Sequence, residues 1–276
     1  MAGELERAQK ALHDLGKSIE SLHGDPSPKS VHKLRTALRR VEAIAAVLDP
    51  ADGKQSRHLA KSIEPVRKAA GQVRDIDVLM ANARKLARYG ASESLTHLLA
   101  SLKAARQENA AQLARAMRHR RNDVERDLKE FSRSVRAALR PAESTSSSGA
   151  ESGQTQEEIH SAAVNLVREL GGWPRLDEHN LHAFRLKVKQ LRYTLHLDEN
   201  ANAALVKALG DVQRRIGDWH DWRQLEEIAR GLLTHEKEHA LLNRIAATVR
   251  RRFNRALAAA NALRGKYLAA PQTMGA

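Results

Sequence analysis

Apolar residues recur at intervals of three or four along almost the whole chain, the spacing that predicts amphipathic α-helices. The first such segment covers residues 4–23, and the second runs from about residue 28 to residue 48. Ser27 and Pro28 predict the start of that second helix, because serine caps a helix N-terminus and proline fits its first turn. We find no convincing run of alternating β-branched residues, which would indicate strands. The pattern therefore predicts an all-α protein.

Glycine and proline residues mark the ends of the other predicted helices, because both destabilise a helix interior. Gly71 divides the segment after the second helix in two, and Gly217 does the same in the second half of the chain. The stretch Gly171–Pro174 predicts a further break. The helices expected on these grounds cover residues 54–70, 72–90, 156–170, 179–197, 201–216, 222–234 and 236–264.

The longest periodic stretch covers residues 92–140 and predicts either one very long helix or an antiparallel pair of helices. Asn122 and Glu125 have the spacing of a capping box, in which both side chains bond to backbone N–H groups at a helix start. This pattern favours the antiparallel pair, with a turn near residues 119–122.

A predicted linker divides the chain into two halves that repeat one pattern. Residues 141–155 are rich in serine and glycine and hold no apolar anchor, so we expect a flexible linker there. The halves on either side, residues 1–140 and 156–276, show two landmarks in the same order. One is a histidine followed by cations three and seven residues later, and the other is a glycine followed by an aspartate four residues later. The sequence thus predicts an internal duplication.

Two of the predicted helices carry a basic face opposite an apolar one. The histidine and the two cations that follow it lie within roughly 60° of one another on a helix that turns about 100° per residue. These residues are His32, Arg35 and Arg39 in the first half, and His182, Arg185 and Lys189 in the second. The apolar side is expected to face a core, and its residues are Leu34, Leu38, Val41, Phe184, Val188 and Leu191.

The charge of the chain indicates a polyanionic partner. Lys and Arg number 47 against 33 Asp and Glu, a formal net charge of +14. A field of that sign attracts nucleic acid, an anionic membrane or polyphosphate. Only three Trp, three Tyr and three Phe are present, whereas proteins that grip single-stranded nucleic acid stack bases on aromatic side chains. A polyanion without bases fits this composition better.

Other compositional features limit the class of protein. The absence of cysteine excludes disulfides, thiolate metal sites and cysteine nucleophiles. It also fits a reducing compartment. No stretch approaches the roughly 18 to 20 unbroken apolar residues of a membrane span, so we expect no membrane partner. The first residues lack an apolar signal core, and we expect a cytoplasmic protein.

At these landmarks the sequence resembles the CHAD family, the conserved histidine α-helical domain. That family shows two copies of a motif similar to Val-His-x-Leu-Arg-x-x-x-Arg-Arg, each followed by a segment similar to Gly-x-x-Arg-Asp-x-Asp-Val-Leu. Residues 31–40 and 71–79 match the first pair closely. The second copy is matched by His182, Arg185, Lys189, Leu191, Arg192 and Tyr193. Glu42, Gln190 and Arg223 depart from the family pattern, which weakens the case for them as ligands.

The resemblance implies two four-helix-bundle-like halves, related by a pseudo-twofold axis around a central basic groove or pore. It further implies that this groove binds inorganic polyphosphate and that the protein is associated with polyphosphate granules. The binding residues it implies are His32, Arg35, Arg39, Arg40, His182, Arg185, Lys189, Arg192 and Tyr193. We expect no cofactor and no metal.

Each of these residues has a structural alternative. A lone histidine is more often an ordinary surface or core residue than a ligand, and basic helix faces are usually only solvated. Arg74, Asp75 and Asp77 fit a capping and salt-bridge cluster at a helix start. A metal at the histidines is disfavoured because neighbouring cations repel it. His220 and Asp221 look like the metal-binding dyad of certain phosphohydrolases, but the other members of that motif are missing.

Two other functions stay open from the sequence. The net charge also fits a nucleic-acid-binding helical protein, although no helix-turn-helix is recognisable. An enzyme acting on phosphoanhydrides would need a nucleophile or metal-held carboxylates beside the basic row. The sequence shows neither a P-loop nor clustered carboxylates, so we expect a binding protein without catalytic residues.

Overall fold

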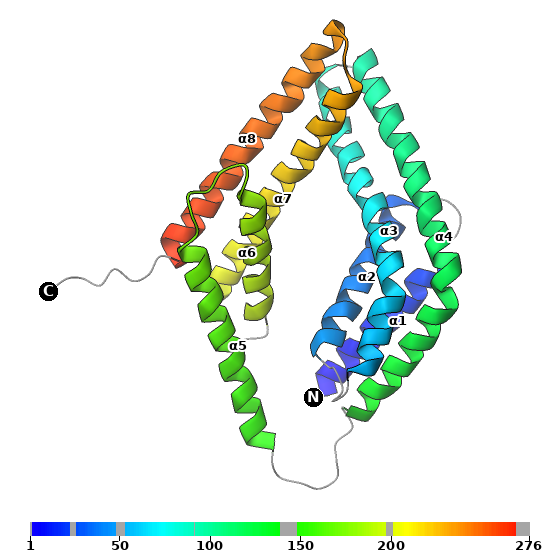
Figure 1. The fold of residues 1–276 in the computed structure, drawn as a ribbon, viewed down its shortest axis with the longest axis vertical. Coiled ribbons are helices and arrows are strands. Elements are labelled where there is room, and N and C mark those ends of the chain that lie inside the picture. Colours follow the sequence, from blue (N-terminus) through cyan, green and yellow to red (C-terminus); the bar gives the residue numbers. More distant parts are fainter. Residues whose placement is uncertain are drawn as a thin grey trace, which may run out of the picture. The chain divides into compact units, whose positions relative to one another are not determined.

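A computed structural model describes residues 2–22, 26–47, 53–90, 92–138, 148–196 and 201–268. These residues contain helices and connecting turns but no strand, which confirms the predicted all-α fold. The chain divides into two compact units, unit 1 at Met1–Ser144 and unit 2 at Thr145–Ala276. The described part of each unit holds four α-helices (Figure 1). None of the described helices is long and apolar enough to cross a membrane.

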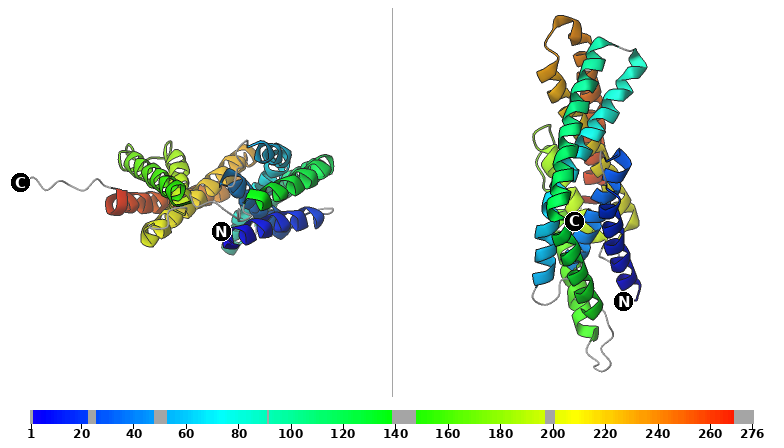
Figure 2. Two further views of the ribbon diagram at one scale, coloured as in Figure 1. Left: turned by 90° about the horizontal axis from the view of Figure 1, so that it is seen from below. Right: turned by 90° about the vertical axis from the view of Figure 1, so that its right-hand side faces the viewer.

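Unit 1 is built on a long antiparallel pair of helices against which two shorter helices pack (Figures 1 and 2). Its helices are α1 (Ala2–Glu20), α2 (Pro28–Val47), α3 (Lys54–Arg84) and α4 (Glu93–Ala138). The Ser30 N–H donates to the Ser27 hydroxyl at 3.1 Å, so the predicted cap of α2 is confirmed. The three predicted core residues of α2 have no exposed surface. Each such side chain contributes about 1.5–3 kcal/mol through burial, and this packing fixes which side of α2 faces outward.

Unit 2 repeats this order with α5 (Ser148–Gly171), α6 (Leu181–Leu195), α7 (Ala203–Leu232) and α8 (His239–Leu263). Phe184, Val188 and Leu191 of α6 are fully buried, as predicted. The Trp173 ring meets Phe184 edge-on, with ring centroids 5.6 Å apart, and so ties the turn after α5 to α6. A short 3₁₀ helix, Glu236–Glu238, precedes α8, and a π-helical turn, Arg264–Leu268, follows it.

The spacing of elements supports the predicted duplication. Gly71 and Gly217 are 146 residues apart, and the same 146 residues separate the first residues of α4 and α8, Glu93 and His239. The glycine and the start of the following long helix are therefore equally spaced in the two units. Equivalent positions in these pairs can be compared residue by residue.

Two predicted helix breaks are wrong. The helix α3 runs through Gly71, and α7 runs through Gly217, so the pairs of helices expected on either side of each glycine are single helices of 31 and 30 residues. A glycine in a helix interior costs up to about 1 kcal/mol relative to alanine, which packing along the rest of a long helix readily offsets. The reason for these glycines lies in the site described below.

The turn predicted near residues 119–122 is also wrong, because α4 is one helix of 46 residues. Arg121 instead donates to Glu125 at 3.0 Å, a pair one turn apart that supports the continuous helix. The helix α5 begins at Ser148, earlier than predicted, and residues 141–147 of the predicted linker lie outside the described residues.

Candidate anion-binding faces

In unit 1 the basic face forms around Arg35, which reaches from α2 to α3. Its Nη1 atom lies 3.5 Å from Asp75 Oδ1. A Cβ atom placed on Gly71 would lie 3.0 Å from the same Nη1 atom, closer than most side-chain contacts allow. Gly71 therefore leaves room for the guanidinium against the surface of α3. This close approach explains a glycine in mid-helix.

Several cations surround Arg35, whose side chain is 24% exposed. Burial lowers the pKa of Arg35, and the positive charges of Arg39, Arg74 and Arg67 lower it further, while Asp75 opposes them. The positive potential at this place is therefore unfavourable for the unliganded protein. We call Arg35, Arg39, Arg67 and Arg74, with His32 on the same side of α2, face 1. The His32 side chain is exposed.

Arg67 is a member of face 1 that sequence analysis missed. Its Nε lies 2.7 Å from Glu42 Oε1, so the residue on α2 that departs from the family pattern pairs with a cation on α3. In unit 2 the equivalent positions are Arg192 and Gln213, and Arg192 Nη1 donates to the Gln213 side chain at 3.2 Å. The cation has thus changed helices between the units. The signal in the sequence is that Arg67 stands four residues before Gly71, as Gln213 does before Gly217.

Unit 2 repeats the packing of arginine against glycine. Arg185 Nε donates to the backbone oxygen of Gln213 at 3.2 Å. A Cβ atom on Gly217 would lie 3.2 Å from Arg185 Nη2. Because Gly217 is one turn after Gln213, its missing side chain uncovers that backbone oxygen. Two landmarks noted separately in the sequence therefore meet in space in both units.

A pair of histidines joins α6 to α7 beside Arg185. The rings of His182 and His220 lie with centroids 4.5 Å apart and planes tilted by 39°. Burial lowers the pKa of His182, and Arg185 adds to the effect. Burial also lowers the pKa of His220, followed by the effects of His182, Arg185 and Arg223. Nδ1 of His182 is buried and has no hydrogen-bond partner within the described part of the chain.

Lys189 and Tyr193 extend this surface along α6. Lys189 Nζ lies 5.5 Å from the centroid of the Tyr193 ring, within the range of a cation–π contact. Tyr193 is 51% exposed. We call the following set face 2: His182, Arg185, Lys189, Arg192, Tyr193, His220 and Arg223. Beside its Arg192 end is an open hollow of about 540 Å³, whose lining includes His196 and Lys207.

Arg40 lies apart from face 1. It follows Arg39 by one residue and so points about 100° further round the helix. Its Nη1 atom lies 3.9 Å from Asp14 Oδ2 of α1, whereas Arg35 turns towards α3. The structure thus brings Arg35 and Arg39 together but leaves Arg40 on the other flank of α2.

Asp77 has a structural role, at a point where α3 is continuous and no helix begins. Arg106 Nε of α4 lies 2.7 Å from Asp77 Oδ1, and both side chains are largely buried. Arg106 also donates to the backbone oxygen of Pro26. In unit 2 the equivalent arginine, Arg252, pairs with Asp218 of α7 at 2.8 Å. These pairs join the long helices and are not part of either face.

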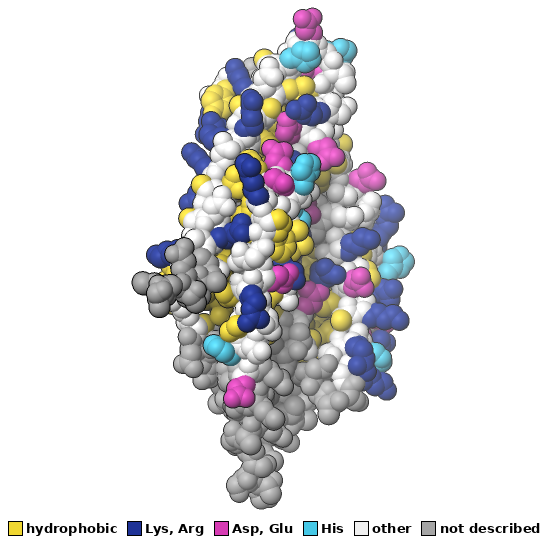
Figure 3. Space-filling view, turned by 60° about the vertical axis from the view of Figure 1, so that its left-hand side comes forward, with side chains coloured by type: hydrophobic (Ala, Val, Ile, Leu, Met, Phe, Trp, Pro, Cys, Tyr) yellow, Lys and Arg dark blue, Asp and Glu magenta, His cyan; other side chains and the backbone are white. Residues whose placement is uncertain are grey.

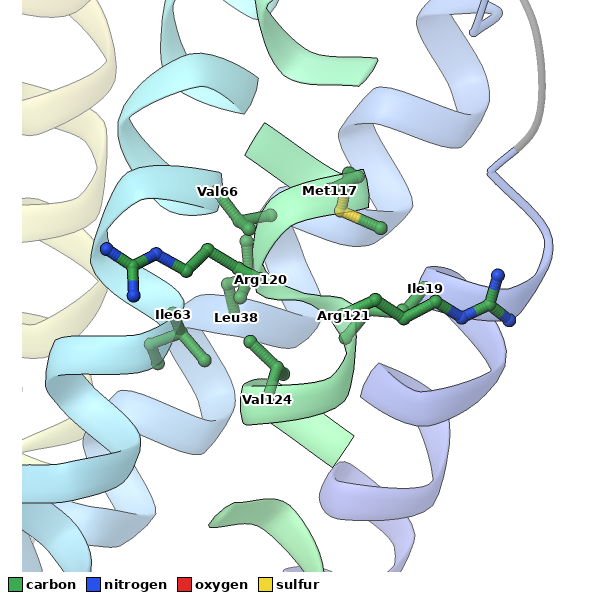
Figure 4. A pocket seen from close by; sticks show the side chains of 8 residues that line it. All are labelled: Ile19, Leu38, Ile63, Val66, Met117, Arg120, Arg121 and Val124. Atoms are coloured by element: carbon green, nitrogen blue, oxygen red, sulfur yellow. The ribbon is translucent and has the colours of Figure 1, made fainter. Parts of the chain in front are cut away.

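Cationic side chains are not confined to the two faces. Figure 3 shows Lys and Arg along the helices of the side that it presents, with Asp and Glu among them. A small pocket in unit 1 is lined by apolar side chains of α1 to α4, while Arg120 and Arg121 extend away from it (Figure 4). It is a gap in the core packing. Among the described residues, no three His, Asp or Glu side chains gather as metal ligands would.

Comparisons with known proteins bear on the fold. The model of the family described as CHAD domain matches residues 6–230. Among solved structures, the crystal structure of the CHAD domain from the plant Ricinus communis is similar, with a TM-score of 0.59 and 18% sequence identity. That similarity covers 96% of this chain and 89% of the plant chain. No curated protein matches the sequence.

Proposed function

The chain belongs to the CHAD domain family, and on that basis we propose that it binds inorganic polyphosphate, without catalysis, through face 1 and face 2. One arrangement carries the proposal. In each unit an arginine packs against a helical glycine, Arg35 against Gly71 and Arg185 against Gly217, with further cations around it. Both units keep this arrangement although a glycine in mid-helix is destabilising. This favours a role for the arginines in binding a common ligand over a role as ordinary solvent-exposed charges.

The chemistry of the faces suits a linear phosphate polymer. Cations three and four residues apart recur about every 5.4 Å along a helix. A guanidinium donates two parallel hydrogen bonds to phosphate oxygens and remains charged at all physiological pH values. Burial lowers the pKa of Arg35 first and the neighbouring arginines lower it further, and a bound anion would offset the repulsion among these cations. Tyr193 is the one Phe, Trp or Tyr residue of the two defined faces, so apart from the histidine rings they offer little for stacking bases.

Charge reversal on the open side of both faces tests the proposal. Arg39→Glu combined with Lys189→Glu should weaken binding of long-chain polyphosphate more than about tenfold at 0.15 M salt, because charged hydrogen bonds each contribute about 1.5–3 kcal/mol. Binding is measured by calorimetry over a range of salt concentrations. The slope of log affinity against log salt should become shallower by roughly 0.7–0.9 for each phosphate that the variant no longer neutralises.

A matched control changes the same net charge away from the faces. Arg121→Glu with Arg230→Glu alters exposed residues paired within their own helices, and it should leave the affinity within about twofold. Equal weakening by both double variants, or equal affinity of the unaltered protein for polyphosphate and duplex DNA, would count against a specific site. Release of orthophosphate with added magnesium or manganese would contradict binding without catalysis. In cells, a fluorescent fusion should gather on polyphosphate granules.

A further inference from the structure

The two units differ at one position beside their matched arginines. His220 on α7 stands where unit 1 has Arg74 on α3, since both follow the glycine by three residues. Arg74 is a permanent cation that acts on Arg35. His220 instead lies in ring contact with His182, at 4.5 Å between centroids. Face 2 therefore has a titratable pair where face 1 has a histidine and an arginine.

The surroundings of this pair are cationic on both helices that carry it. Arg185 comes from α6 and Arg223 from α7, where Arg223 also donates to the backbone oxygen of Glu178. Asp221 follows His220 on α7 and is an acidic neighbour that takes part in an interaction.

Two acidic groups, one on α7 and one on α5, are paired with other cations. On the α8 side, Asp218 of α7 is paired with Arg252 at 2.8 Å. On the α5 side, Glu169 is paired with Lys187 at 2.8 Å. The carboxylates of Asp218 and Glu169 thus each form an ion pair with a cation outside the histidine pair. Any countercharge that they provide to the imidazoles is therefore reduced.

Without an anion, the cost of placing two further positive charges here is high, so both imidazoles favour the neutral form at neutral pH. The buried Nδ1 of His182 has no partner in the described structure. A phosphate group beside the pair would supply negative charge and hydrogen-bond acceptors to the protonated rings. Resting on the proposed function, we propose that face 2 takes up protons on His182 and His220 when it binds polyphosphate, so that its affinity rises as the pH falls.

The direction follows from linkage. The pair has a lowered proton affinity in the free protein and a higher one in the complex. Protons are therefore taken up on binding between these two sets of pKa values, and affinity gains about tenfold per pH unit for each proton taken up. The gain is complete below the pKa values of the free protein and absent above those of the complex. Face 1 as defined contains a single histidine, His32, so it lacks an equivalent histidine pair.

A reciprocal exchange between the units tests this coupling in the full chain. Affinity for long-chain polyphosphate is measured between pH 5.5 and 7.5, and proton uptake is obtained by calorimetry in buffers with different heats of ionisation. His220→Arg gives unit 2 the residue of unit 1. It should raise affinity at pH 7.5, reduce the gain on acidification at least about threefold, and remove about one proton of uptake. Arg74→His should lower the affinity at pH 7.5, increase the gain in affinity on acidification and add about one proton of uptake.

His58→Arg is the matched control, because His58 is an exposed residue that precedes Arg67 by nine residues and so lies on the opposite side of α3. It should leave the pH dependence unchanged. Tight binding with a pH dependence that neither exchange alters would overturn the coupling and leave the proposed function standing. Absence of polyphosphate binding at every pH would overturn both. Zinc binding that His220→Arg abolishes, without proton uptake on addition of polyphosphate, would assign the pair to a metal and also overturn the coupling.

Discussion

At the scale of single residues, one arginine in each face is positioned by a glycine on the neighbouring helix, which has no side chain to displace it. Arg35 and Arg185 lie where a side chain on Gly71 or Gly217 would crowd the guanidinium. The neighbouring atoms are the ends of flexible side chains, so an added methyl group would displace them without breaking the backbone. These glycines therefore serve the faces and weaken the helices that contain them.

Gly71→Ala and Gly217→Ala should separate stability from binding. Each should leave the free energy of unfolding unchanged or raise it by up to about 1 kcal/mol, because alanine is the better helix former. Each should also weaken polyphosphate binding, since the arginine must move. Urea unfolding and calorimetry measure the two effects. Gly16→Ala in α1, where a Cβ atom would meet nothing within 4 Å, should stabilise without changing affinity. Binding unaltered in the first two variants would contradict this role for the glycines.

Sequence periodicity was sufficient to place the cations of each basic helix on one side, because a rigid helix fixes the angle between residues. Periodicity within one helix could not predict which side chains on different helices contact each other. The pairing of Glu42 with Arg67 and the ring contact of His182 with His220 depend on the register of neighbouring helices. Arg40 shows the same limit, since its match to a family motif did not reveal that it turns to Asp14 of α1. The assignment of polyphosphate-binding residues stays a prediction.

At the scale of elements, the units depend on helices longer than local signals suggested. Local signals predicted breaks in α3 and α7 and favoured one in α4, because a glycine or a capping pattern resembles a terminus when only neighbouring residues are considered. In α4 the side chains on either side of the proposed turn, Met117 and Val124, are both buried in one core. Continuous packing of that kind outweighs a local capping preference of about 1 kcal/mol.

Proline at the middle of α4 distinguishes a continuous helix from a turn. Asn122→Pro should lower the free energy of unfolding by about 3 kcal/mol or more, because proline removes a backbone donor and clashes with the preceding turn. The exposed Asn122→Ala should be neutral or slightly stabilising. Urea unfolding followed by far-UV circular dichroism measures both. A proline variant as stable as the alanine variant would mean that α4 is interrupted there.

At the scale of the whole molecule, the chain consists of two compact units, each with its own core and its own basic face. The pseudo-twofold axis and the shared central groove implied by the resemblance stay predictions. Two basic faces on one chain matter for any polymer that is long enough to reach both. Under the proposed function, a polymer that contacts one face would meet the other at a raised effective concentration.

The units expressed separately, residues 1–144 and 145–276, should each fold into helical bundles and bind polyphosphate more weakly than the full chain. For long polymers the loss should exceed about tenfold, because linked sites gain avidity. For polymers too short to reach both faces the full chain and the better unit should differ by no more than about twofold. Circular dichroism and calorimetry on size-fractionated polyphosphate test this. A full chain without any advantage on long polymers would show that one face acts alone.

The pairs Glu42–Arg67 and Arg192–Gln213 occupy equivalent positions, but the cation is on α3 in unit 1 and on α6 in unit 2. This difference affects how the two halves of the sequence should be aligned and compared. Compared position by position, residues 42 and 192 have opposite charges and look unrelated. Compared as inter-helix pairs, the two halves keep a positively charged member and differ in the helix that carries it. At this place the likeness of the two halves is seen in the pair of positions and not in either position alone. Searches for distant copies of this repeat would gain from scoring inter-helix pairs jointly.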